Sequence, residues 1–157
     1  MAVAETQNWS ARLAELGITL PSVVPPVAAY VPAVRTGNYV YTSGQLPIVE
    51  GKLTIAGKLG AGVSDEDAKA AARACALNAL AAVDALVGID SVVRIVKVVG
   101  FVASDPGFSG QAGVLNGASE LLGEIFGEAG VHARSAVGVA VLPLDSPVEV
   151  ELILEFA

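Results

Sequence analysis

Residues 64–103, SDEDAKAAARACALNALAAVDALVGIDSVVRIVKVVGFVA, place a strong helix signal directly before a strong strand signal. Ser64 followed by three acidic residues is typical of a helix N-terminus, and Gly88 is typical of a helix end. Between them small residues recur at spacings of three and four, which predicts a thin helix face that can approach a sheet closely. These residues are Ala68, Ala71, Ala72, Cys75, Ala79 and Ala82. Residues 91–103 are too rich in β-branched side chains for a helix and predict a long strand, bulged at Gly100.

Weaker signals on both sides extend this pair into an α+β order. Toward the C-terminus we expect a turn at 105–107, a helix at 111–126 and strands at 134–142 and 148–156. Toward the N-terminus we expect a short helix at 8–16, an extended proline-containing segment at 20–32, strands at 38–45 and 52–55, and a glycine loop at 57–62. Counting the extended segment at 20–32 as a leading strand with edge pairing at most, the order β-β-β-α-β-α-β-β predicts one sheet with helices covering one face. The last strand alternates apolar residues with Glu149, Glu151 and Glu155. Its carboxylate-bearing face is therefore either exposed to solvent or part of a functional site.

Composition restricts the class of protein. The chain of 157 residues fits one domain, and 54% hydrophobic with 16% charged residues excludes intrinsic disorder. A net charge of −7 argues against binding to nucleic acid or to an anionic membrane. We expect no membrane span and no signal peptide, because charged residues or glycines interrupt every apolar run. The single cysteine allows no internal disulfide and favours a reducing, cytoplasmic location. Such an apolar chain is also expected to hide surface in an oligomer.

Most motifs that carry chemistry are absent. The sequence has one histidine and no pair of cysteines, so we expect no dedicated zinc site. It has no Walker loop, and the glycine loop at 57–62 lacks the strand-to-helix context of a dinucleotide site. No GxSxG sequence accompanies the histidine. We therefore expect no metal and no organic cofactor.

Arg134 and Glu149 are the candidates that residue chemistry alone suggests. An arginine at the start of an apolar strand can bind a carboxylate with two hydrogen bonds, and a glutamate on a partner strand could act as a general base. Spacing alone favours a different interpretation, in which the same two residues form a cross-strand surface pair that contributes little energy. His132 is interpreted as a hydrogen-bonded loop residue and Cys75 as a small buried hydrophobe.

Two segments resemble one protein family. Residues 42–47, TSGQLP, are similar to the TSGQ(I/L)P segment of the RidA family, also called YjgF or L-PSP endoribonuclease-like. The stretch ARSAV at 133–137, followed by LP at 142–143 and VEVE at 148–151, resembles the closing signature of that family. The resemblance runs from about Pro25 to the C-terminus, which predicts an N-terminal extension at 1–24 and a RidA-like domain at 25–157. Alanine stands at 136 where many members have cysteine, as in a divergent branch.

The resemblance implies a chorismate-mutase-like α+β fold, assembled as a homotrimer with three clefts between subunits. In RidA proteins these clefts hydrolyse reactive 2-imino or 2-enamino acids to 2-oxo acids and ammonia. The implied catalytic residues are Arg134, for the substrate carboxylate, and Glu149, for the water. The implied substrate-binding residues are Tyr30, Ser43, Gly44, Asn116 and Ala136.

Two other functions stay open. The same clefts could hold a small carboxylate-bearing metabolite without turning it over. Endoribonuclease activity is the weakest reading, because the net charge of −7 comes with no basic stripe.

Overall fold

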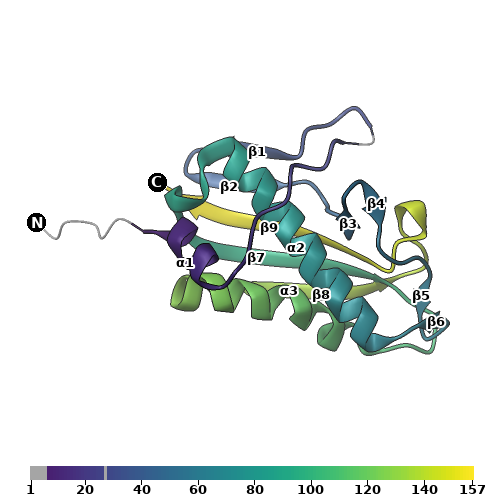
Figure 1. Cartoon of the computed structure of the whole chain (residues 1–157). Coiled ribbons are helices and arrows are strands. Elements are labelled where there is room, and N and C mark those ends of the chain that lie inside the picture. The colour runs from purple at the N-terminus through teal and green to yellow at the C-terminus, as the bar shows by residue number, and fades with distance from the viewer. Residues whose placement is uncertain (1–6, 27) are drawn as a thin grey trace, which may run out of the picture.

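A computed structural model describes residues 7–26 and 28–157. Its main sheet has five strands in the order β1-β2-β9-β7-β8, and all neighbours are antiparallel except β7 and β8. The strands are β1 (Ala33–Thr36), β2 (Tyr39–Thr42), β7 (Val92–Ala103), β8 (Ala133–Val139) and β9 (Val148–Phe156). Helices α2 (Asp65–Val87) and α3 (Gln111–Phe126) lie side by side on one face of this sheet (Figure 1). This is the α+β arrangement, with helices covering one face, that the sequence predicts.

Short elements surround this core. They are α1 (Trp9–Glu15), the hairpin of β3 (Ile48–Val49) and β4 (Lys52–Leu53), the pair β5 (Lys58–Leu59) and β6 (Gly62–Val63), and 3-10 turns at Ile89–Ser91, Gly127–Gly130 and Pro143–Asp145. Helix α1 docks on the core through Trp9, whose Nε1 donates to the Val92 carbonyl oxygen at 2.8 Å and whose ring meets Phe126 edge-on. The backbone N–H and hydroxyl of Ser10 donate to Asp90, and these bonds lower the pKa of that carboxyl group.

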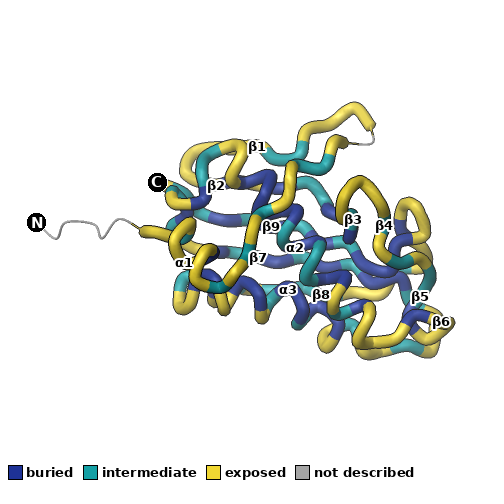
Figure 2. The backbone as a smooth tube through the Cα atoms, viewed as in Figure 1, coloured by how far each residue is buried: buried dark blue, intermediate teal, exposed yellow. Residues whose placement is uncertain are grey.

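Helix α2 begins and ends where its sequence predicts. The Ser64 hydroxyl accepts a hydrogen bond from the Asp67 N–H at 3.1 Å, and the helix stops at Gly88, whose φ of 80° suits glycine. Its small residues are buried, as Figure 2 shows for the inner sides of both long helices. Helix α2 is also long and apolar enough to cross a membrane, but more than half of its most apolar 18-residue segment is buried inside this domain. We therefore interpret α2 as a core helix of the domain.

The close approach of α2 and α3 depends on Gly117. A Cβ placed on Gly117 would collide with the backbone carbonyl of Lys69 in α2. Replacing Gly117 by alanine is therefore expected to lower the free energy of unfolding by about 2–3 kcal/mol, because backbone cannot yield as a side chain can. Denaturant unfolding monitored by circular dichroism measures this change.

Gly113 on the same helix is the matched control. A Cβ there meets nothing within 4 Å, so Gly113→Ala is expected to raise the free energy of unfolding by about 0.5–1 kcal/mol through helix propensity. Equal effects of the two substitutions would contradict the role given to Gly117.

The alternation predicted for β9 is confirmed. Val148, Val150, Leu152 and Leu154 are buried toward the helices, and the glutamates lie on the opposite, uncovered face of the sheet. The bulge predicted at Gly100 is wrong, since the register shifts occur near Val92–Arg94 and Ile95–Lys97. Gly100 instead leaves room for Leu115 of α3, whose side chain lies where a Cβ on residue 100 would be.

Two other strand predictions need correction. The leading strand, placed in the extended segment at 20–32, is instead β1 at Ala33–Thr36, directly after that segment, and it is formed by pairing with β2 across a turn at Gly37. The strand predicted to reach residue 142 ends at Val139, because its partner β7 ends at Ala103. The 3-10 turn at Pro143–Asp145 follows and leads into β9.

Candidate functional site

Arg134 lies on β8 and turns its side chain toward α3. Its Nη1 donates to Asn116 Oδ1 at 2.8 Å and to Ser119 Oγ at 3.1 Å, and its Nη2 donates to the Ala112 carbonyl oxygen at 3.3 Å. The three acceptors follow each other at spacings of four and three, so they form one stripe along α3. The predicted residues Arg134 and Asn116 are thus brought into direct contact.

The guanidinium of Arg134 keeps one edge for a ligand. Of its five N–H groups, the three bonds to α3 leave Nε–H and one Nη2–H without an acceptor among residues 7–26 and 28–157. Nε and Nη2 share an edge, and two parallel N–H donors on one edge match the two oxygens of a carboxylate. Arg134 is half-buried, and its Nη2 lies on the exposed side of the guanidinium, whereas the bonds of Nη1 are partly buried.

Ser119 and His132 complete the surroundings of Arg134, and sequence analysis did not connect them with it. Ser119 Oγ lies 2.9 Å from His132 Nε2, and His132 Nδ1 lies 2.6 Å from the Gly130 carbonyl oxygen. The interpretation of His132 as a hydrogen-bonded loop residue is correct. The sequence did contain one indication for Ser119: it follows Asn116 by three residues and therefore lies on the same face of the predicted helix.

Glu149 lies on the face of the sheet that no helix covers, against Gly44. A Cβ on Gly44 would collide with the Glu149 carboxylate, so the carboxylate in this position lies directly over the Gly44 backbone and would have to move if a side chain stood there. The adjacent residues pair with each other, since Gln45 N–H donates to the Val150 carbonyl at 2.8 Å and Val150 N–H donates back at 3.0 Å. Burial raises the pKa of the half-buried Glu149 carboxyl group, and the nearby charge of Glu151 raises it further.

The expected pairing of Arg134 with Glu149 across adjacent strands is wrong. Strand β7 separates β8 from β9, and Arg134 pairs with Val98 whereas Glu149 pairs with Phe101. Positions 98 and 101 of β7 face opposite sides of the sheet, because successive residues alternate. Arg134 therefore lies on the helix side and Glu149 on the uncovered side, with no ion pair between them.

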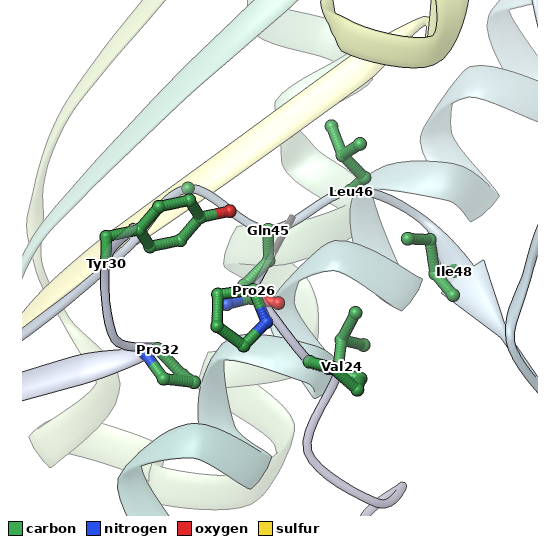
Figure 3. Close-up of a pocket in the computed structure, with 9 residues that line it drawn as sticks. Val24, Pro26, Tyr30, Pro32, Gln45, Leu46 and Ile48 are labelled. Carbon is green, nitrogen blue, oxygen red and sulfur yellow. The ribbon is translucent and has the colours of Figure 1, made fainter. Parts of the chain in front are cut away.

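Tyr30 and Ser43 lie beside Gly44. The Ser43 hydroxyl donates to the Val31 carbonyl at 2.6 Å and its N–H donates to the Pro32 carbonyl at 2.8 Å, which holds the TSGQ segment against the segment that carries Tyr30. Tyr30 is 44% exposed and helps to line a cavity of about 30 Å³, with its hydroxyl turned toward Gln45 and Leu46 (Figure 3). That volume holds about one water molecule, so the cavity is too small for a metabolite.

The predicted site residues therefore divide into two groups. The helix-side group consists of Arg134, Asn116 and Ala136, which is half-buried on the same face of β8 as Arg134. The open-face group consists of Glu149, Gly44, Ser43 and Tyr30. A substrate that contacts both Arg134 and Glu149 would need the two groups to come from different chains.

Two further observations concern metal and thiol chemistry. Among the residues that the structure describes, no three His, Cys, Asp or Glu side chains are grouped to hold a metal ion. Cys75 is fully buried in α2, and burial raises the pKa of its thiol well above the usual value. Cys75 is thus the small buried hydrophobe that the sequence predicts.

Comparison with known proteins places this geometry in a family. The family model described as "YjgF/chorismate mutase-like, putative endoribonuclease" matches residues 10–156. Protein TCP17 of Trypanosoma cruzi is 43% identical over 157 residues, covering 99% of this chain and 98% of TCP17. The crystal structure of Atu1372 from Agrobacterium tumefaciens, a protein of unknown function, has a TM-score of 0.87 and 44% identity, over 95% of this chain and 92% of that one. The crystal structure of the YjgF gene product from E. coli has a TM-score of 0.63 and 31% identity, over 85% and 93%. The chain belongs to the YjgF/chorismate mutase-like family and has its α+β fold.

Proposed function

We propose that this protein hydrolyses 2-imino or 2-enamino acids to 2-oxo acids and ammonia, in clefts between the subunits of a homotrimer in the cytoplasm. The observation that carries the proposal is the open Nε–Nη2 edge of Arg134, already oriented by three hydrogen bonds to α3. Preorganised donors of this kind bind a carboxylate at little entropic cost. The crystal structure of E. coli TdcF with bound serine, 27% identical to this chain over 87% of its length, supports a small carboxylate-bearing ligand in this fold.

In the proposed reaction Arg134 holds the substrate carboxylate and Glu149 of another chain activates water. Glu149 takes a proton from the water as the water oxygen bonds to C2 of the imine, the C=N electron pair moves to nitrogen, and Glu149 passes the proton to that nitrogen. The resulting tetrahedral carbinolamine collapses: Glu149 takes the hydroxyl proton as the C2–O bond becomes a carbonyl, the C–N bond breaks, and the proton is passed to the leaving nitrogen, which departs as ammonia. A raised pKa suits Glu149 to this exchange, because a general base works best when its pKa is close to the working pH.

Assembly is part of the proposal, because the two groups of site residues lie on opposite faces of one chain. The uncovered face of the sheet carries exposed apolar side chains on β1, β2 and β8, namely Val34, Tyr39, Tyr41 and Val137. Apolar surface of this kind is typical of a protein interface. We expect this face to be covered by the neighbouring subunits.

Light scattering after size exclusion tests the assembly. We expect a mass three times that of the 15.8 kDa chain. Placing a charge in the interface, as in Tyr41→Asp, is expected to shift the mass toward that of the monomer and to remove turnover, because the charge would be buried without a partner. Glu50→Asp in the β3–β4 turn is the control and should leave the trimer intact. A monomeric wild-type protein would contradict the trimer.

The activity itself is tested with 2-aminoacrylate and 2-iminobutanoate generated in situ. Faster formation of the 2-oxo acid with the folded protein supports the proposal, and no acceleration contradicts it. The second candidate function, binding of a small carboxylate without turnover, is favoured by the serine-bound relative. It would be supported by measurable binding of 2-oxobutyrate with no hydrolysis of either imine.

A further inference from the structure

A chain of hydrogen bonds runs from a backbone carbonyl to Arg134. It passes from the Gly130 oxygen to His132 Nδ1 (2.6 Å), from His132 Nε2 to Ser119 Oγ (2.9 Å), and from Ser119 Oγ to Arg134 Nη1 (3.1 Å). His132 lies just before β8 and Ser119 lies in the middle of α3. The chain thus connects the two elements between which the Arg134 side chain lies.

With a neutral imidazole, the donors and acceptors of this chain can be assigned in only one direction. A carbonyl oxygen only accepts, so His132 Nδ1 must carry a proton. In the neutral imidazole Nε2 is then an acceptor, and the Ser119 hydroxyl must donate to it. This leaves the lone pairs of Ser119 Oγ for the N–H of Arg134, which can only donate.

We propose that Ser119 and His132 are positioning residues for the carboxylate-binding edge of Arg134; this inference rests on the proposed function of that edge. The oriented Ser119 hydroxyl and the Asn116 amide each take one N–H of Nη1, so the guanidinium plane is held at two points on that side. Holding this side fixes the orientation of the opposite edge, on which Nε–H and one Nη2–H remain for the carboxylate. Without Ser119 the guanidinium has fewer fixed contacts, and binding a carboxylate must then restrict its motion.

The first test needs no substrate: it determines which ring nitrogen of His132 carries a proton, and so the direction of the hydrogen bonds. His132 is the single histidine of the sequence, so a sample with ¹⁵N-labelled histidine gives one imidazole signal set. At a pH where the ring is neutral we expect a proton on Nδ1 and none on Nε2, and we expect Ser119→Ala to weaken this preference. An Nε2–H tautomer in the wild-type protein would overturn the proposal.

The second test measures how tightly a carboxylate-bearing ligand binds. Ser119→Ala is expected to raise the Kd for 2-oxobutyrate and the KM for the imino acid by about tenfold, with kcat within about twofold, because one hydrogen bond to a charged group is lost. Ser119→Thr keeps a hydroxyl and should restore most of the affinity. Ser91→Ala is the matched control: it removes one half-buried serine hydrogen bond, to the Gly88 carbonyl at 2.7 Å, and should change neither constant.

The outcomes separate this inference from the proposed function. If the wild-type protein hydrolyses no imine but 2-oxobutyrate binding weakens in Ser119→Ala, the hydrolysis is contradicted and the positioning role stands. If hydrolysis occurs and Ser119→Ala, folded as judged by its melting temperature, changes neither Kd nor KM, the positioning role is overturned and the hydrolysis stands.

Discussion

Replacing Arg134 by lysine is expected to raise the KM for a 2-imino acid by about a hundredfold, and replacing it by alanine by about a thousandfold. Arg134 already donates three hydrogen bonds to Asn116, Ser119 and Ala112, and it still has two N–H groups on one edge for the substrate. A lysine ammonium has three donors in all and no planar edge, so it cannot do both. Initial-rate kinetics and 2-oxobutyrate titration measure the change.

Arg73→Lys is the control for this substitution. Arg73 lies on α2 and forms a surface ion pair with Glu124 at 3.7 Å, where one cation can replace another at little cost. We expect unchanged kinetics in this variant. An Arg134→Lys protein that turns over imino acids with the wild-type KM would show that the substrate carboxylate binds elsewhere.

Replacing Glu149 by glutamine is expected to lower kcat by about a thousandfold and to leave the Kd for 2-oxobutyrate within severalfold of the wild-type value. The amide keeps the volume of the side chain beside Gly44 but cannot take a proton from water. The split between kcat and Kd distinguishes loss of a base from loss of binding. Stopped-flow kinetics and calorimetry provide the two readings.

The pH profile provides a second reading of the same residue. Turnover needs the ionised carboxylate, so kcat/KM should fall as the pH drops through the raised pKa of Glu149. Glu151→Gln removes the like charge that contributes to this shift, which lowers the pKa of Glu149. The acid limb of the profile should then move to lower pH while the maximum rate is retained.

Glu151→Gln is also the matched control for Glu149→Gln, because both residues lie on the same face of β9. If the two variants lost the same amount of activity, the effect would come from charge on that face and not from proton transfer. If Glu149→Gln kept the wild-type kcat, Glu149 would not be the base.

The long elements could be predicted from the sequence because their signals are local. The bounds expected for α3 and β9 are those observed, since spacing along the chain alone decides which residues of a helix or strand share a face. The N-cap of α2 is equally local, because its donor and acceptor lie three residues apart. The division at residue 24 between an extension and a domain stays a prediction.

Strand β1 and the bulges of β7 could not be predicted in this way. Strand β1 is short, follows a run of prolines and exists because β2 pairs with it. The bulges lie where the register of β7 shifts against β9, a strand about fifty residues further along the chain. They do not lie at the glycine within β7. Both features depend on a partner that local pattern does not identify.

For the site, the candidate residues could be named from the sequence and its family resemblance, but the contacts among them could not. Sequence alone determined the helix on which Asn116 lies, the strand that carries Arg134 and the alternation that puts Glu149 on a polar face, because each depends on spacing within one element. Only the tertiary structure decided that β7 lies between β8 and β9, that Arg134 and Glu149 face opposite sides of the sheet, and that Ser119 and His132 meet beside the guanidinium. The physical reason is that strand order and helix docking are settled by burial of the whole apolar core, to which every element contributes and which no single segment encodes.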